Sequence, residues 1–417
     1  MSRTVVVLGG GVIGLCCALH LSRSGWNVVV VERGRPDHDG CSLGNAGMVV
    51  PSHFVPLAAP GMVGYGLRRM WNPESPFALR PRLDAELLDW GLRFLRSCTR
   101  EHVDRSVDLL RDLNLRSRTL FEELSTTLDD DFGLVRRGLL MLCRTRHALD
   151  EETRFAERSR SLGVPAEVVQ PDRLAELDPD VEMSAAGGVY FPKDCHLSPR
   201  RFVAAVKREL ERSGARFVWE AEATGWERAG DRIRAVRTRQ GDLGGDAFVV
   251  AGGAWSSALA RGLGLRLPLQ GGKGYSMTLP NPPRTPRLCS ILVEARVAVT
   301  PMPEGLRIGG TMEIVGKDLR VDPRRVEGIR KSVPAYFPAF DRESLRGVPV
   351  WSGLRPCSPD GLPYVGSVPG CSNVRIATGH AMMGLSLAPV TGELVAADLD
   401  GRTTDIDIQR LAPARHG

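Results

Sequence analysis

The first 32 residues constrain the fold of this chain more than any other segment. An apolar run, Thr4–Leu8, precedes three glycines, Gly9, Gly11 and Gly14, in the spacing G-x-G-x-x-G, and an apolar helical pattern follows them. A second apolar run, residues 26–32, comes next. This order predicts a strand, a tight turn, a helix and a second strand, which together begin a parallel sheet.

Glycines at this spacing suit a bound pyrophosphate, because they allow a tight turn and a close backbone approach, and the helix N-terminus adds amide donors and a positive dipole end. Glu32 ends the second strand 18 residues after Gly14. A carboxylate there accepts hydrogen bonds from a ribose diol and repels the 2′-phosphate of NADP. We therefore expect an adenine dinucleotide, rather than a plain glycine turn beside a surface glutamate. The contacts expected at this end are Gly9, Gly11, Val12, Ile13, Gly14, Glu32 and Arg33.

Two later segments favour FAD over NAD. The segment DAFVVAGGAW places Gly252 and Gly253 at the end of a buried-type strand, and residues 374–397 arrange a strand, a glycine turn and a helix start in series. A helix N-terminus there could stabilise negative charge at N1 of a reduced flavin. Each segment alone also fits an ordinary strand–helix connection. Since the chain has no second G-x-G-x-x-G for NAD(P)H, together they suggest that an organic substrate reduces the flavin.

A third segment, residues 41–61, is rich in small residues. Asn45 lies between Gly44 and Gly47, which suits a loop whose backbone runs along a ligand, and Ser42 could reach a phosphate or ribityl oxygen. Composition alone favours an ordinary irregular connection here.

Local patterns predict further elements. Apolar residues at helical spacing predict two long helices within residues 84–128, and Ser198 is expected to cap a later helix. We also expect one strand over residues 225–240, one over residues 290–301, and a hairpin turn at residues 303–305.

Length and composition set wider limits. With 417 residues, two interwoven domains are expected rather than one core. The net charge of +6 carries no long Lys/Arg run, so we expect no nucleic-acid partner. The nine cysteines contain no C-x-x-C, which argues against a disulfide framework or a metal site and for a reducing compartment. The start resembles no secretory signal and no stretch is apolar enough to span a bilayer. We expect a cytoplasmic protein, with peripheral contact at the inner face of the plasma membrane left open.

Long motifs across the chain resemble those of FAD-dependent D-amino-acid dehydrogenases of the small-subunit type, within the D-amino-acid oxidase/glycine oxidase superfamily. They are GGGVIG, S-x-x-N-A-G with a downstream A-A-P-G, KGYSMT (273–278), LRIGGTMEIVG (306–316), GLRPCSPDGLPYVG (353–366) and ATGHAMMG (377–384). The resemblance implies a mixed α/β (α+β) fold, in which a Rossmann-type FAD-binding domain is interleaved with an antiparallel-sheet substrate domain. We assign residues 1–85, 187–265 and 350–417 to the FAD-binding domain, and residues 86–186 and 266–349 to the substrate-binding domain.

The resemblance also implies substrate contacts. Arg355 occupies the arginine of G-L-R-P that grips the substrate carboxylate, which fits the need of a buried carboxylate for a bidentate donor. The alternative interpretation is that Arg355 caps carbonyl groups at the end of a strand or pairs with a distant acidic side chain. Tyr275 is the second catalytic candidate. An equally good interpretation is that Tyr275 is a core residue whose hydroxyl has a partner within the protein. Arg307 and His53 are further candidates for substrate binding.

The remaining expected cofactor contacts come from five parts of the chain. They are Ser42, Asn45, Ala46, Gly47, Met48, Ala223, Gly252, Gly253, Trp255, Gly353, Gly379, His380, Met383, Gly384 and Leu385. The FAD is expected to be non-covalent, because the tethering cysteine of sarcosine-oxidase relatives falls at Gly353, and Cys357 is interpreted as structural.

The implied activity is oxidative deamination of a D-amino acid, with hydride transfer from Cα to flavin N5 and an imine that hydrolyses to a 2-oxo acid. The acceptor is a respiratory acceptor or quinone, or oxygen in an amino-acid or glycine oxidase. D-hydroxyproline or D-proline oxidation is the rival within the family. GHAMMG lacks the arginine that glycine oxidases carry after this histidine. An NAD-linked dehydrogenase and a non-enzymatic nucleotide binder are the rivals outside the family, and the oligomeric state is left open.

Overall fold

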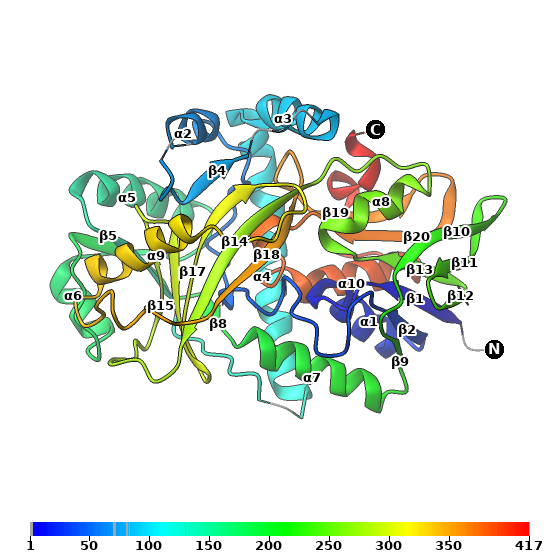
Figure 1. Ribbon diagram of the computed structural model, residues 1–417, viewed down its shortest axis with the longest axis horizontal. Coiled ribbons are helices and arrows are strands. Elements are labelled where there is room, and N and C mark those ends of the chain that lie inside the picture. Colours follow the sequence, from blue (N-terminus) through cyan, green and yellow to red (C-terminus); the bar gives the residue numbers. More distant parts are fainter. Residues whose placement is uncertain (1–2, 70–71, 81, 83, 130, 417) are drawn as a thin grey trace.

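The computed structural model describes residues 3–69, 72–80, 82, 84–129 and 131–416. Two large sheets, one in each half of the molecule, organise these residues (Figure 1). The ends of the expected FAD segments at residues 1–2 and 417 lie outside the described residues. The mixed α/β fold class expected from the sequence is confirmed.

The first large sheet begins with the predicted strand–turn–helix–strand unit. Its six strands are, in spatial order, β19 (Tyr364–Val368), β20 (Cys371–Thr378), β13 (Ala247–Val250), β1 (Thr4–Leu8), β2 (Asn27–Val31) and β9 (Arg216–Val218). All neighbours are parallel except β19 and β20. This sheet is the parallel sheet that the N-terminal pattern predicts.

Alternate residues of β1 build two separate layers. Val5 and Val7 pack on the side of the helices α1 (Val12–Arg23) and α10 (Ala388–Leu399), whereas Val6 packs on the other side. The opposite directions follow from the two-residue repeat of a strand. The sheet is therefore buried on both faces, as parallel sheets require.

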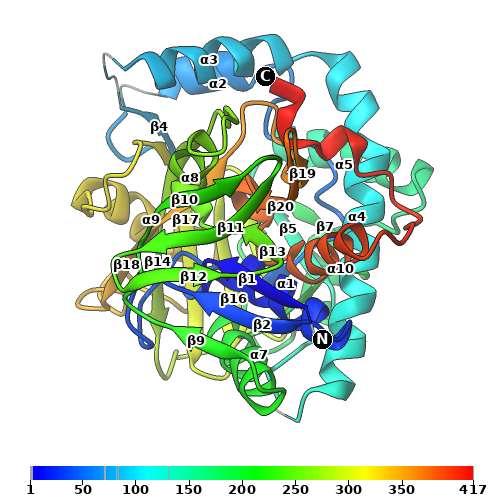
Figure 2. The same cartoon turned by 90° about the vertical axis from the view of Figure 1, so that its right-hand side faces the viewer.

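A small antiparallel sheet covers the second face of the six-stranded sheet (Figure 2). It consists of β10 (Ala223–Ala229), β11 (Arg232–Thr238) and β12 (Gly241–Gly244). We expected one strand over residues 225–240, and this prediction is wrong. Gly230 has φ +63°, which lets the backbone reverse between β10 and β11.

The second large sheet is mostly antiparallel. Along its main path the strands are β18 (Val350–Cys357), β14 (Gln270–Leu279), β17 (Gly305–Ile314), β16 (Val297–Met302), β15 (Cys289–Leu292), β5 (Leu139–Cys143), β7 (Gly187–Phe191) and β6 (Glu167–Val169), and β4 (Phe77–Leu79) pairs with β17. The hairpin predicted at residues 303–305 joins β16 and β17. The single strand expected over 290–301 is two strands, because Arg296 turns the backbone at φ +53°.

The other helices pack on one of the large sheets, on the small sheet or on neighbouring helices. They are α2 (Met62–Arg69), α3 (Ala85–Ser97), α4 (Arg100–Thr127), α5 (Arg146–Ser161), α6 (Pro171–Leu177), α7 (Pro199–Arg212), α8 (Ser256–Arg261) and α9 (Pro323–Tyr336). The two helices predicted within residues 84–128 are confirmed as α3 and α4, and Ser198 caps α7 as expected. Helix α2 was not predicted, because its glycines and the prolines around it favour an irregular loop.

Sheet membership shifts three of the expected domain boundaries. We expected β7, β18 and β4 in the FAD-binding segments, but all three pair within the nine-stranded sheet. We therefore propose that these strands belong to the substrate-binding domain, and keep the remaining assignment as proposed. Within the described part of the chain, no helix combines the length and the apolar character needed to cross a bilayer.

Candidate active site

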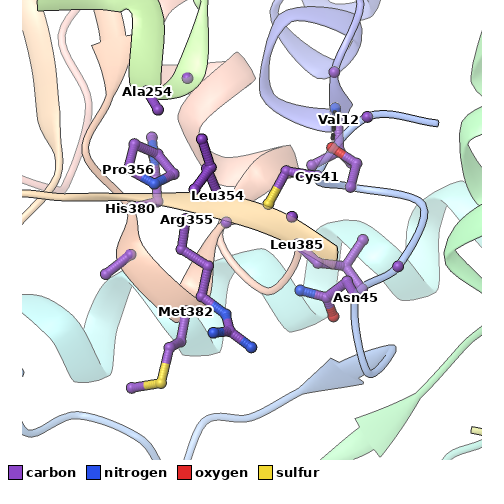
Figure 3. Close-up of a pocket in the computed structure, with 18 of the residues that line it drawn as sticks. Val12, Cys41, Asn45, Ala254, Leu354, Arg355, Pro356, His380, Met382 and Leu385 are labelled. Carbon is purple, nitrogen blue, oxygen red and sulfur yellow. Dashed lines mark hydrogen bonds between the residues drawn. The ribbon is translucent and has the colours of Figure 1, made fainter. Parts of the chain in front are cut away.

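A cavity of about 770 Å³ lies between the two large sheets. Residues that follow the carboxyl ends of β1, β2, β13 and β20 line one end of it, and Met141, Ile291 and Ala298 of the nine-stranded sheet line another part. Ligands of open parallel sheets bind in this position, outside the carboxyl ends of the strands. Figure 3 shows residues of the loops and of β18 that surround part of the cavity.

The glycine turn after β1 leaves no room for side chains. Gly9 has φ +121°, and a Cβ on it would lie 2.4 Å from the carbonyl oxygen of Ala251. A Cβ on Gly14 would lie 2.0 Å from the carbonyl oxygen of Gly9, so Gly14 serves the close packing of helix on strand and does not itself line the cavity. At the start of α1, the backbone amide of Val12 donates to Oγ of Ser42 at 2.9 Å.

Two backbone amides fix the carboxylate of Glu32. The amides of Gly10 and Gly34 each donate to one of its carboxylate oxygens at 2.8 Å. Each carboxylate oxygen can accept further hydrogen bonds, and Glu32 lines the cavity. Beside it, the guanidinium of Arg33 lies 3.5 Å from the ring centroid of Trp255. This donor and acceptor set fits the adenosine half of FAD.

The segment after β20 also fits a flavin. His380 lines the cavity; its Nε2 lies 2.9 Å from Oγ1 of Thr391, while its Nδ1 is buried without a partner in the described structure. Burial lowers the pKa of His380 to about 3, so the ring is neutral. A buried polar atom needs a partner, and FAD offers polar ring atoms of the kind required.

Most of the expected cofactor residues surround this one cavity. Those that line it are Gly9, Gly11, Val12, Ile13, Glu32, Arg33, Ser42, Asn45, Ala46, Met48, Ala223, Gly252, Gly253, Trp255, Gly353, His380, Met383, Gly384 and Leu385. Gly14, Gly47 and Gly379 are not in the lining. Gly47 and Gly379 have φ of +77° and +81° and lie where a Cβ would collide with Leu197 and Tyr364, so they shape the loops instead.

Arg307 does not reach the cavity, and its expected substrate contact is wrong. Its Nη1 donates to the carbonyl oxygens of Leu43 and Asn45, at 3.2 and 2.9 Å, and its Nε donates to Thr278. Burial lowers its pKa to about 10. Arg307 therefore ties the loop of residues 41–48 to β17.

Tyr275 lines the cavity, but its hydroxyl is occupied. It donates to Glu313 at 2.6 Å and accepts from the amide of Asp322 at 3.1 Å. Burial, with the neighbouring Glu313 carboxylate, raises the pKa of the phenol. The geometry favours the alternative of a core tyrosine over the catalytic role that we expected.

Arg355 extends from β18 into the cavity (Figure 3). Its Nη1 donates to the carbonyl oxygen of Thr311 at 2.8 Å, and burial lowers its pKa. No carboxylate of the described residues forms an ion pair with it. A guanidinium has five donor hydrogens, so most of its donor capacity is left for a ligand. The expected carboxylate-binding position is thus available.

Three further polar side chains line the cavity. His53 lines the cavity, as do Tyr65 of α2 and Arg296. The hydroxyl of Tyr65 is buried without a hydrogen-bond partner in the described structure, and the guanidinium of Arg296 lies 5.5 Å from its ring centroid. The sequence did not indicate Tyr65 or Arg296 as site residues. Tyr65 lies in a segment whose composition predicts a loop, and Arg296 lies in a segment whose pattern predicts one continuous strand.

The described residues contain no group of three His, Cys, Asp or Glu side chains that could hold a metal ion. The arrangement instead offers a cofactor cradle at one end, a cation at the centre and a polar wall beside it. Such a site can orient a small carboxylate against a flavin.

Comparison with known proteins gives three findings. The family model DAO, described as FAD dependent oxidoreductase, matches residues 4–398. A D-amino acid dehydrogenase of Granulibacter bethesdensis is 33% identical over 417 residues, and one of Methylobacterium radiotolerans is 34% identical over 428 residues; each alignment covers 99% of both chains. The crystal structure of glycine oxidase from Geobacillus kaustophilus superposes with a TM-score of 0.77 at 25% identity, covering 100% of both chains.

Proposed function

Because the chain belongs to the DAO family of FAD-dependent oxidoreductases, we propose that it catalyses the oxidative deamination of D-amino acids. Non-covalently bound FAD supplies the hydride acceptor, N5, for the hydrogen on the substrate Cα. The imine product hydrolyses to a 2-oxo acid and ammonia, or remains cyclic for a proline analogue. Full-length similarity to proteins named D-amino acid dehydrogenase supports this substrate class.

The observation that carries the proposal is the cation of Arg355 without an acidic partner among the described residues. A carboxylate that leaves water for the cavity needs a charge-assisted, bidentate donor. Thr311 holds one side of the guanidinium through its carbonyl oxygen, so the position of the substrate carboxylate is fixed relative to the cavity. Fixed orientation of the reacting Cα–H is a large part of catalysis in this proposal.

The substrate amine must be neutral when hydride leaves Cα, because its lone pair stabilises the developing positive charge. In this proposal, activity therefore rises with pH toward the ionisation of the bound amine.

A cyclic imino acid is the second candidate substrate. The hydroxyl of Tyr65 has no described partner, and Nε2 of His53 forms no hydrogen bond within the described residues. The hydroxyl of Tyr65 suits a polar substituent such as the ring hydroxyl of 4-hydroxy-D-proline, and Nε2 of His53 is left for the substrate amine. We infer that D-hydroxyproline or D-proline competes with acyclic D-amino acids for this site.

The decisive experiment mixes the holoenzyme anaerobically with D- and L-amino acids, including cis- and trans-4-hydroxy-D-proline, and records bleaching of the flavin absorbance. Arg355→Ala should lower kcat/KM by an amount equivalent to about 2–5 kcal/mol, while FAD stays bound. Arg228→Ala is the control, because Arg228 caps the carbonyl oxygens of Gly230 and Gly370 outside the cavity. Unchanged turnover in Arg355→Ala would remove the assigned role.

We propose a respiratory acceptor, such as a quinone, in preference to oxygen, and a cytoplasmic location at the inner face of the plasma membrane. Support comes from an apolar stripe on α3, where Leu88, Leu92 and Leu95 are 63%, 57% and 51% exposed. Helix α2 lies beside α3 in both views (Figures 1 and 2) and carries exposed Arg68 and Arg69. Apolar side chains flanked by cations bind anionic membranes.

This membrane contact is tested by co-sedimentation with vesicles of anionic and of neutral lipid. Replacing Leu88, Leu92 and Leu95 by serine should weaken binding to the anionic vesicles. Leu319→Ser is the control, since Leu319 is 44% exposed outside α2 and α3. Equal binding of the triple variant and the wild type would refute this surface. Direct reoxidation by oxygen at the turnover rate would instead favour the oxidase alternative.

A further inference from the structure

A buried hydrogen-bond relay leads from the interior to the cavity through Asp194, Ser52 and His53. The hydroxyl of Ser52 lies 2.5 Å from Oδ2 of Asp194 and 2.9 Å from Nδ1 of His53. The backbone amide of Ser52 donates to Oδ1 of Asp194 at 3.0 Å. Because Nδ1 of His53 is engaged, Nε2 is the ring nitrogen left for a ligand in the cavity.

Asp194 is isolated from water and from strong ion pairs. It is 0% exposed and forms no ion pair within the described structure. Arg118 of α4 acts on it through space, but Arg118 pairs with Glu122. The thiols of Cys195 and Cys289 are the other titratable groups that face it. Burial raises the pKa of Asp194 to about 7, against the two hydrogen bonds from Ser52.

His53 faces a different set of groups. Arg296 is the charged side chain that acts on it. Burial, with Arg296, lowers the pKa of His53 to about 4, so the ring is neutral near pH 7. A neutral imidazole has one donor and one acceptor nitrogen, and the partner of Nδ1 decides which is which.

The single proton of the Ser52 hydroxyl links the two ends of the relay. When Asp194 is ionised, it can only accept, so Ser52 donates to it and accepts from Nδ1–H of His53, and Nε2 is then an acceptor. When Asp194 is protonated, the direction reverses, Ser52 donates to Nδ1, and Nε2 carries the hydrogen. The charge of Asp194 thus selects the tautomer that His53 presents to the cavity.

We propose that Asp194 is a positioning residue that, through Ser52, holds His53 in the tautomer whose Nε2 accepts an N–H of the substrate amine. This inference rests on the proposed amino-acid substrate and defines how its amine is recognised. An acceptor that takes an N–H leaves the nitrogen lone pair free to assist hydride departure from Cα. The opposite tautomer would donate to that lone pair and block it.

The test uses two planar carboxylates of nearly equal shape that the enzyme does not oxidise. Pyrrole-2-carboxylate presents an N–H donor beside its carboxylate, and furan-2-carboxylate presents an oxygen acceptor. Each is titrated into the holoenzyme, and its Kd is read from the perturbation of the flavin absorbance. The ratio of the two Kd values reports the hydrogen-bond character of the cavity without any turnover.

Asp194→Asn is the informative variant. Its carbonyl can still accept from the Ser52 amide, while its NH2 replaces Oδ2 and must donate to the Ser52 hydroxyl, which reverses the relay. The preference for pyrrole-2-carboxylate is the Kd of furan-2-carboxylate divided by the Kd of pyrrole-2-carboxylate. We expect this ratio to fall by roughly five- to tenfold, since one hydrogen bond is exchanged for a mismatch. Asp178→Asn is the matched control, because Asp178 is also a buried aspartate that accepts backbone amides, but it lies outside the cavity lining.

Three further measurements test the inference, and two of them do not depend on the folding of Asp194→Asn. Ser52→Ala interrupts the relay and should also reduce the preference, and in the wild type the preference should fall as the pH decreases through about 7, the pKa of Asp194. At a pH above the pKa of Asp194, the ¹⁵N shifts of labelled histidine, with His53 assigned through His53→Gln, should place hydrogen on Nδ1 in the wild type and on Nε2 in Asp194→Asn.

Retention of the wild-type preference and tautomer in Asp194→Asn or in Ser52→Ala would overturn the inference. Failure of the proposed function has a different signature. If neither carboxylate perturbed the flavin, the assignment of Arg355 would fail, and the ¹⁵N shifts would still decide whether Asp194 controls His53.

Discussion

The guanidinium of Arg355 lies directly over the Cα of Gly274 on the neighbouring strand. A Cβ at position 274 would come within 2.1 Å of Nη1 and 2.2 Å of Nη2. In the β14–β18 register, Gly274 is opposite Gly353, two residues before Arg355. The missing side chain therefore determines where the cation can lie, and Thr311, with φ +70°, turns its carbonyl oxygen toward the same guanidinium.

Gly274→Ala should displace Arg355 without removing it. A shift of about 1 Å in a positioning group can cost on the order of 100-fold in rate, so we expect kcat/KM for flavin reduction by an amino acid to fall between tenfold and 100-fold. Stopped-flow absorbance measures this rate. Gly91→Ala is the control, because Gly91 has open space around it on α3. A fall of equal size in both variants would contradict the explanation.

Glu32→Gln should weaken FAD binding. The amide NH2 group cannot accept from the backbone amide that it would face, so either Gly10 or Gly34 loses a 2.8 Å hydrogen bond. An unmade bond of this kind costs about 1–3 kcal/mol, equivalent to roughly five- to 150-fold in Kd. Reconstitution of the apoprotein, followed by flavin fluorescence, measures the affinity. An unchanged Kd would show that Glu32 does not support the ribose end of the site.

The sequence could predict the parts of this site that depend on local geometry. The glycine turn and the position of Glu32 follow from the strand–turn–helix order, because spacing along the sequence sets distances within one unit. Gly274 carried a signal too, since a glycine inside a strand pattern indicates a close approach. What it approaches depends on the pairing of β14 with β18, and that pairing is not a local property.

The direction in which each side chain points explains why other parts of the site differ from the sequence prediction. Arg307 lies in a strand, where side chains alternate between the two faces, so the sequence pattern allows its side chain to point into the cavity or toward a loop. The position of residues 41–48 in the folded chain determines which of the two occurs. Tyr65 lies among glycines that predict a loop, yet α2 forms where it packs against β4. The role expected for Arg355 came from the resemblance to a known family. The hydrogen bond that occupies the Tyr275 hydroxyl depends on tertiary packing, so the sequence could not predict it.

Arg307→Met should separate cofactor retention from substrate binding. It removes the donors to Leu43 and Asn45, so the loop beside the cavity is less restrained and FAD should dissociate several-fold faster. The Kd of pyrrole-2-carboxylate for the FAD-loaded variant should stay within about twofold of the wild type, because Arg355 is untouched. Flavin release into filtrate and absorbance titration measure the two quantities. Weaker carboxylate binding with normal FAD retention would restore the substrate role expected from the sequence.

Asp360 and Arg415 form a buried pair that anchors the C-terminal segment. Nε and Nη2 of Arg415 lie 2.7 and 3.0 Å from the carboxylate oxygens, and the side chains of Arg415 and Asp360 are 14% and 7% exposed. The side chain of His416 lies 3.1 Å from the same carboxylate. Although burial opposes ionisation, these partners hold the pKa of Asp360 well below its usual range. Asp360 follows the G-L-R-P motif, so the pair also supports the turn after Arg355.

Arg415→Gln should lower the free energy of unfolding by about 3–5 kcal/mol at pH 7, because it leaves a buried carboxylate unpaired. Since the folded pKa of Asp360 is depressed, the stability that it contributes is complete above the unfolded pKa of about 4 and is lost as the pH falls toward the folded value. The difference between wild type and variant should therefore narrow progressively below about pH 4. Urea unfolding followed by tryptophan fluorescence across pH 3–8 measures it. A difference that stayed constant with pH would show that Asp360 does not change its charge between the folded and unfolded states.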